Sequence, residues 1–101
     1  MNLNEMQKAI YGNKVNRKFN VTDVGKEIIL MTEELGELAR AYKNSDKKPA
    51  REISNKPEMV DAIGDLMVYC LGLSEMLGIS AQETLEKIIE NNTRRIHTGH
   101  I

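Results

Sequence analysis

The stretch IILMTEELGELARAY, residues 28 to 42, decides the fold that the sequence predicts. Apolar residues recur in it at intervals of three and four, which is the spacing of one face of an α-helix. They are Ile28, Met31, Leu35, Leu38 and Tyr42. Thr22 and Asp23 are both good N-caps, so we expect a helix from there to about Lys43, with this apolar face in the core.

Three further segments show helical periodicity, and no segment alternates with the period of a β-strand. We expect helices over residues 3–12, 57–77 and 81–95. Asn2 with Glu5 has the spacing of a capping box, while Gly12 and Gly78 are the expected ends of the first and third helices. The sequence therefore predicts one all-α domain, residues 1–101, of four or five helices. An antiparallel hairpin of the helices around 22–43 and 57–77 forms its centre.

The composition narrows the range of partners and compartments. A chain of 101 residues with net charge −1 gives no indication of binding to nucleic acid or to an anionic membrane. No segment approaches the ~20 apolar residues of a membrane span, and the N-terminus lacks the features of a signal peptide. The single cysteine, Cys70, is expected to be a small buried hydrophobe. We therefore expect a cytoplasmic protein.

Two acidic series accompany the apolar faces of the hairpin. The first is Glu33, Glu34 and Glu37, and the second is Glu58, Asp61 and Asp65. Like charges three or four positions apart repel each other by a few tenths of a kcal/mol, and residues 57–80 contain no Lys or Arg that would offset this. Oxygen ligands without Cys or His select Mg²⁺, Mn²⁺ or Ca²⁺ over zinc. The two series predict either a shared metal site or two solvated acidic faces.

Three segments carry a resemblance to a known family. EELGELARAY, EMVDAIGDLMVYCLGLSEMLGIS and KIIENNTRR together resemble the MazG-like all-α nucleoside triphosphate pyrophosphohydrolases, over roughly residues 12 to 96. That family shows E-E-x-x-E on one helix, E-x-x-D on the next, and an Asn with a basic residue three further on. The resemblance implies metal-dependent hydrolysis of a nucleoside triphosphate, a dNTP or a non-standard NTP, to the monophosphate and pyrophosphate.

The resemblance also implies a ligand set for Mg²⁺, with Mn²⁺ as the other candidate ion. The implied ligands are Glu34, Glu37, Asp61 and Asp65, with Glu58 as an additional or alternative ligand. Aligning Asp65 with the motif aspartate places Ala62 where the family has a glutamate, so the principal ligand of the second motif stays open. Glu33 or Glu34 is placed to take the proton from the attacking water.

Substrate-binding side chains are expected at both ends of the chain. Asn92 and Arg95 match the trailing motif, although Asn91 with Arg94 is an equally legal register. Lys14, Arg17 and Lys18 are either phosphate ligands or ordinary solvated cations. The aromatic residues available to stack on a base are Tyr11, Phe19, Tyr42 and Tyr69.

Two alternatives remain open at this point. One is a phosphoribosyl-ATP pyrophosphohydrolase of the same superfamily, and the other is a non-catalytic helical module that self-associates or binds a partner helix. Residues 66–73, LMVYCLGL, are apolar almost all round, which is unusual for a helix at the surface of a monomer. We therefore expect a homodimer or homotetramer, in which two hairpins complete a four-helix bundle.

Overall fold

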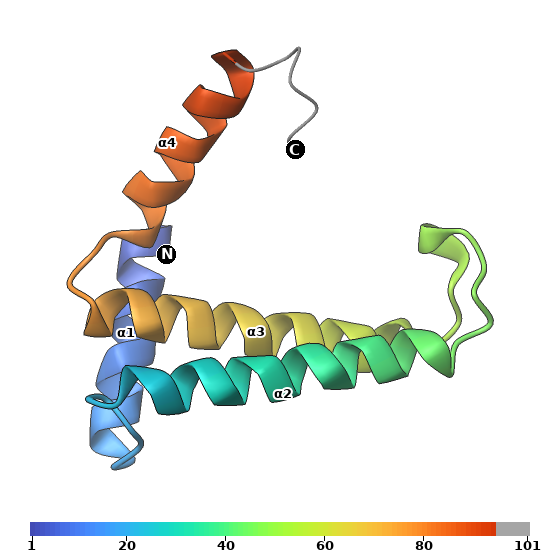
Figure 1. The fold of residues 1–101 in the computed structure, drawn as a ribbon, viewed down its shortest axis with the longest axis horizontal. Coiled ribbons are helices and arrows are strands. Elements are labelled where there is room, and N and C mark those ends of the chain that lie inside the picture. The colour runs from blue at the N-terminus through green and yellow to red at the C-terminus, as the bar shows by residue number, and fades with distance from the viewer. Residues whose placement is uncertain (95–101) are drawn as a thin grey trace.

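A computed structural model describes residues 1–94 of the chain, and these residues contain helices and no strand, which confirms the all-α fold. The helices are α1 (Leu3–Asn16), α2 (Val24–Lys43), the short 3₁₀ helix η1 (Ala50–Glu52), α3 (Lys56–Met76) and α4 (Ala81–Arg94). Helices α2 and α3 form the predicted antiparallel hairpin, and α1 lies across the end where α2 begins and α3 ends (Figure 1).

The helix ends follow the predicted caps, with one exception. The Asn2 side chain accepts from the Glu5 amide at 2.8 Å, and the Glu5 carboxylate accepts from the Asn2 amide at 3.1 Å, so the capping box is confirmed. The prediction that Gly12 ends α1 is wrong, because the helix continues through it to Asn16. A glycine ends a helix where the chain needs a positive φ, and here that conformation is taken by Lys18, at φ 58°. Gly78, at φ 71°, does follow the end of α3.

Helix α4 is attached to the rest of the chain through hydrogen bonds of Gln7, which is 3% exposed. Its amide nitrogen donates to Glu75 at 2.9 Å and to the carbonyl of Ile79 at 2.7 Å. Its amide oxygen accepts from the backbone N–H of Ala81 at 2.9 Å. The connection between α3 and α4 is thus fixed to α1, and α4 projects from the end of the hairpin instead of packing along it (Figure 1).

The apolar face predicted for α2 is buried only in part within the chain, since Met31 and Leu38 are partly buried. Ile28, Leu35 and Tyr42 are about half exposed, whereas Glu27 and Ala41 are buried. The periodicity shows that a face is apolar, but it does not identify the partner that covers it. The buried side of α2 therefore overlaps the predicted face only at Met31 and Leu38.

A second apolar surface runs along α3 and α4. On α3 it includes Val60, Ile63 and Met67, and on α4 it includes Leu85, Ile88 and Ile89. Cys70 is exposed beside them, so the expectation that it is buried is wrong for the single chain. Among residues 1–94, no single helix is long and apolar enough to cross a membrane; α3 and α4, bent by 105°, reach that length and composition only when counted together.

Candidate active site

Acidic side chains of both hairpin helices line one cavity of about 310 Å³, which we call the acidic cavity. Helix α2 contributes Glu37, and helix α3 contributes Glu58, Asp61 and Asp65. The antiparallel pairing of the helices brings these residues together although they lie more than twenty positions apart in the sequence. Four of the five predicted metal ligands therefore border one space.

The fifth predicted ligand, Glu34, lies one turn earlier on α2 and lines a neighbouring cavity of about 400 Å³. This junction cavity lies where the C-terminal end of α1 meets the hairpin. Asp65 lines both cavities, so the two are neighbours. Two cations line the junction cavity, Lys14 of α1 and Arg17 of the turn after it. The other lining residues are Ile10, Asn13, Phe19, Val68 and Tyr69.

The electrostatics around Glu34 are unfavourable for its ionised form. Partial burial raises the pKa of the Glu34 carboxyl, and the negative charges of Glu37 and Asp65 raise it further. Its Oε2 atom is enclosed and has no hydrogen-bond partner. A buried carboxylate oxygen without a donor is destabilising, and a cation placed beside it would remove both the repulsion and the unmet hydrogen bond.

The donor chemistry suits a hard divalent cation, since the charged oxygens come from carboxylates and no His or Cys lines the acidic cavity. Within the described part of the chain, however, no three His, Cys, Asp or Glu side chains converge closely enough to hold one ion as they stand. The backbone thus brings ligands of the right kind to one place, and closure on an ion requires rotation of exposed side chains. The predicted ligands have the oxygen atoms that Mg²⁺ prefers. Their arrangement around an ion stays a prediction.

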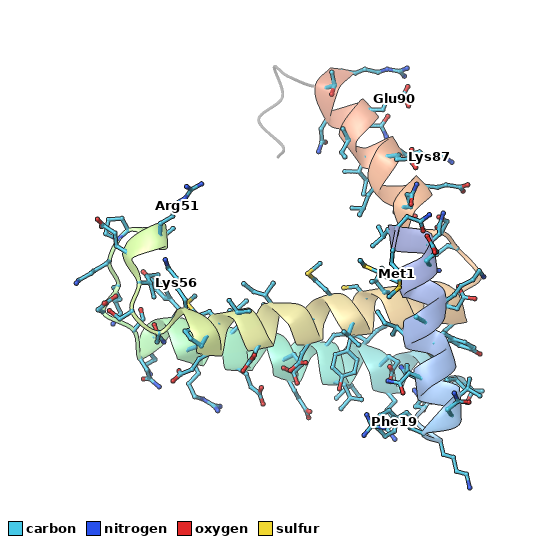
Figure 2. The ribbon with its side chains drawn as sticks, turned by 180° about the vertical axis from the view of Figure 1, so that it is seen from behind. Met1, Phe19, Arg51, Lys56, Lys87 and Glu90 are labelled. Atoms are coloured by element: carbon cyan, nitrogen blue, oxygen red, sulfur yellow. The ribbon has the colours of Figure 1, made fainter. Side chains whose placement is uncertain are left out.

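The structure separates the remaining predicted residues. Glu33 is exposed and lines neither cavity, although its charge contributes to the raised pKa of Glu34. Lys18 lines a third cavity of about 300 Å³, together with Lys14, Phe19, Asn20 and Lys26 among others. Asn92 lies near the free end of α4, two residues beyond Glu90, which Figure 2 shows far from the hairpin. Arg95 lies outside the described residues.

The structure shows two features of the site that the sequence analysis did not predict: an ion pair of Lys14 and the position of Tyr69 at two cavities. Lys14, expected to be a solvated cation or a phosphate ligand, is buried and paired with Glu27, a residue that the sequence analysis did not single out. The sequence did contain one indication of this role for Glu27. Glu27, Glu34 and Ala41 lie seven positions apart and therefore share one face of α2. Tyr69 lines both the junction cavity and the third cavity, and burial, followed by the charge of Glu34, raises the pKa of its hydroxyl.

Comparison with known families identifies the chain. The family model for phosphoribosyl-ATP pyrophosphohydrolase matches residues 2–92, and the chain therefore belongs to that family. The match supports the predicted MazG-like superfamily and an enzyme that hydrolyses phosphoric anhydrides, and it points to the branch first considered as an alternative rather than to MazG itself. No curated protein and no solved structure matches the chain.

Proposed function

We propose that this pyrophosphohydrolase hydrolyses a nucleoside triphosphate, a dNTP or a non-standard NTP, to the monophosphate and pyrophosphate with Mg²⁺ or Mn²⁺. The observation that supports this best is the junction cavity, in which Glu34 and Asp65 lie together with Lys14 and Arg17. Carboxylates are suitable ligands for the metal, and cationic side chains are suitable partners for the phosphate oxygens. One cavity therefore offers both the metal ligands and the positive charge that phosphoryl transfer requires.

In this proposal the carboxylates of the hairpin hold the metal. They are Glu34, Glu37, Asp61 and Asp65, with Glu58 as an additional or alternative ligand. A bound Mg²⁺ would neutralise phosphate charge and lower the pKa of a coordinated water. Glu33 or Glu34 accepts the proton of the attacking water, and Arg17, whose side chain is exposed, is a better phosphate ligand than Lys14, which Glu27 already engages.

A second candidate substrate is phosphoribosyl-ATP, and the family match favours it. As its name states, this molecule carries a phosphoribosyl group in addition to a triphosphate. The third cavity adjoins the junction cavity at Lys14, Phe19 and Tyr69, and it offers Lys18 and Lys26. Two lysines next to the triphosphate site suit a substrate with a second phosphate, whereas an ordinary NTP leaves them without a partner.

A panel of nucleotides tests both substrates. Pyrophosphate release is measured with and without Mg²⁺ from the standard NTPs and dNTPs, from non-standard NTPs and from phosphoribosyl-ATP. Metal-dependent release from one class identifies the substrate. The absence of release from every member would contradict the enzymatic proposal and would favour the non-catalytic helical module.

We further propose that the active form is a homodimer or homotetramer. The support is the exposed apolar surface of two helices, since six of its residues are 45–64% exposed: Val60, Ile63, Met67, Leu85, Ile88 and Ile89. The apolar residues of α3 and α4 supply the surface, and closed symmetric assemblies bury such surfaces in pairs. Asn92, proposed as a substrate ligand, lies near the free end of α4 and lines none of the three cavities of its own chain, so it would reach a site only in a partner chain.

A further inference from the structure

The turn that follows α1 holds the ring of Phe19 in a fixed place. The Phe19 amide donates to the carbonyl of Lys14 at 2.8 Å, and Lys18 takes the positive φ that reverses the chain. The Asn20 side chain then donates to the carbonyl of Asp23 at 2.7 Å and accepts from the Asp23 amide at 2.9 Å. The turn between α1 and α2 is therefore closed by hydrogen bonds on both sides of Phe19.

Buried groups hold this turn against the helices. The second bond from the Asn20 amide goes to Glu27 at 3.0 Å, and Glu27, 1% exposed, also pairs with Lys14. Gly72 of α3 leaves room for the Lys14 stem, since a Cβ at that position would lie 3.3 Å from Lys14 Cδ. Residues of α1, α2 and α3 thus support the turn that carries Phe19.

Phe19 remains half exposed, at 49%. Figure 2 shows it beside the C-terminal end of α1. Phe19 lines both the junction cavity, which Glu34 and Asp65 also line, and the third cavity, which Lys18 and Lys26 also line. The Arg17 guanidinium lies over it, with Cζ 4.7 Å from the ring centroid. A flat apolar surface that is already fixed binds a flat ligand with little loss of conformational entropy.

We propose that Phe19, backed by Arg17, is the platform on which the nucleobase of the substrate stacks, and that Asn20 and Glu27 are the residues that position it. The inference rests on the proposed function, because it takes the phosphates to lie at Glu34 and Asp65 in the same cavity. Every base presents a π-face, so stacking strengthens the binding of all nucleotides without selecting among them. Selection among bases then falls to groups that meet the edge of the base.

Steady-state kinetics of the full-length protein test the platform through the separation of KM from kcat. Phe19→Ala is expected to raise KM on the order of 10-fold for every nucleotide that is hydrolysed, with kcat within about twofold. Phe19→Tyr keeps the π-face and is expected to retain the wild-type KM. Inhibition by inorganic tripolyphosphate, which has no base, should weaken much less in Phe19→Ala than nucleotide binding does. Asn20→Ala is expected to raise KM in the same base-dependent way.

Tyr42→Ala is the matched control, because Tyr42 is 48% exposed and lines none of the three cavities. An unchanged KM in Phe19→Ala would overturn the platform, and so would an equal weakening of tripolyphosphate or an equal effect in Tyr42→Ala. Calorimetric binding of the α,β-methylene analogue of ATP gives a readout without turnover. If no nucleotide is hydrolysed, the proposed function fails, yet loss of analogue binding in Phe19→Ala and not in Phe19→Tyr would still support stacking.

Discussion

Lys14 of α1 forms an ion pair with Glu27 of α2, and the two side chains are 11% and 2% exposed. Glu27 is the largest fully enclosed side chain in the described part of the molecule. An ion pair in that position contributes little net stability compared with apolar residues of similar size, but removal of one partner leaves a buried charge uncompensated. The pair therefore makes the junction of the three helices dependent on both of its members.

Glu27→Ala is expected to lower the free energy of unfolding by about 3–5 kcal/mol, because it leaves the Lys14 ammonium buried without a partner. The double variant Lys14→Met with Glu27→Leu should recover most of that loss. Denaturant titration followed by circular dichroism measures both. Lys26→Ala, an exposed change on the same helix, should stay within about 0.5 kcal/mol of wild type. A loss of the same size in the double variant would contradict this account of the pair.

Millimolar Mg²⁺ is expected to raise the melting temperature of the wild-type protein, since a ligand that binds only the native state stabilises it. Glu37→Ala and Asp61→Ala should abolish hydrolysis and the Mg²⁺-induced shift. Without metal these variants should be as stable as wild type or more stable, because a repulsive charge has been removed. Glu86→Ala, an exposed acidic position on α4, serves as the control and should keep the shift. Wild-type turnover in Glu37→Ala would show that the ligand assignment is wrong.

Stability is expected to fall in acid partly through Glu75. The hydrogen bond from Gln7, with a smaller contribution from Lys8, holds the pKa of the Glu75 carboxyl below its ordinary value of 4.5. A lowered folded-state pKa gives stability that is present above the unfolded-state pKa and is lost as the pH falls through the folded-state pKa. Glu75→Gln should therefore weaken the pH dependence of unfolding below about pH 4.5, as measured by denaturant titrations at several pH values.

The pKa shift of Glu34 is opposite in sign to that of Glu75, so the two residues can be compared. Its raised pKa means that, without metal, its contribution to stability is present at low pH and is lost as the pH rises through the folded-state pKa. Glu34→Gln should then stabilise the metal-free protein at pH 7 and have little effect in acid. Parallel pH profiles for the Glu34 and Glu75 variants would refute the two assignments together.

Light scattering coupled to size-exclusion chromatography is expected to show a dimer or tetramer rather than a monomer of 11.4 kDa. Ile89 is 64% exposed on α4, so Ile89→Asp would be harmless in a monomer but should dissociate the oligomer. Lys87→Asp, on the same helix, is the control. An active wild-type monomer would defeat the proposal.

The sequence predicts the helices and the acidic cavity well, because both follow from local spacing. Asn2, Asp23 and Gly78 mark helix ends as expected, and Glu37, Asp61 and Asp65 line one cavity because α2 and α3 pair in an antiparallel hairpin. These features depend on neighbours along the chain or on a single helix pairing.

The features that the sequence did not predict concern which residues of different helices pack against each other. Nothing in the local sequence states that Lys14 enters a gap at Gly72, or that the apolar face with Leu35 remains open. Ala62, which departs from the family pattern, is 5% exposed in the wall of the acidic cavity, between the flanking carboxylates Asp61 and Asp65. Burial of that kind depends on the distance between two helix axes, which periodicity does not contain.

The projecting position of α4 links folding to concentration. An isolated helix of 14 residues is only marginally stable in water, and α4 is attached to its own chain at one end through Gln7 and the α3–α4 connection. If a neighbour supplies the missing contacts, helix formation in α4 and association are one event. Dilution of the protein would then unwind α4 before the hairpin melts, so the helical content would report on how many chains have found a partner.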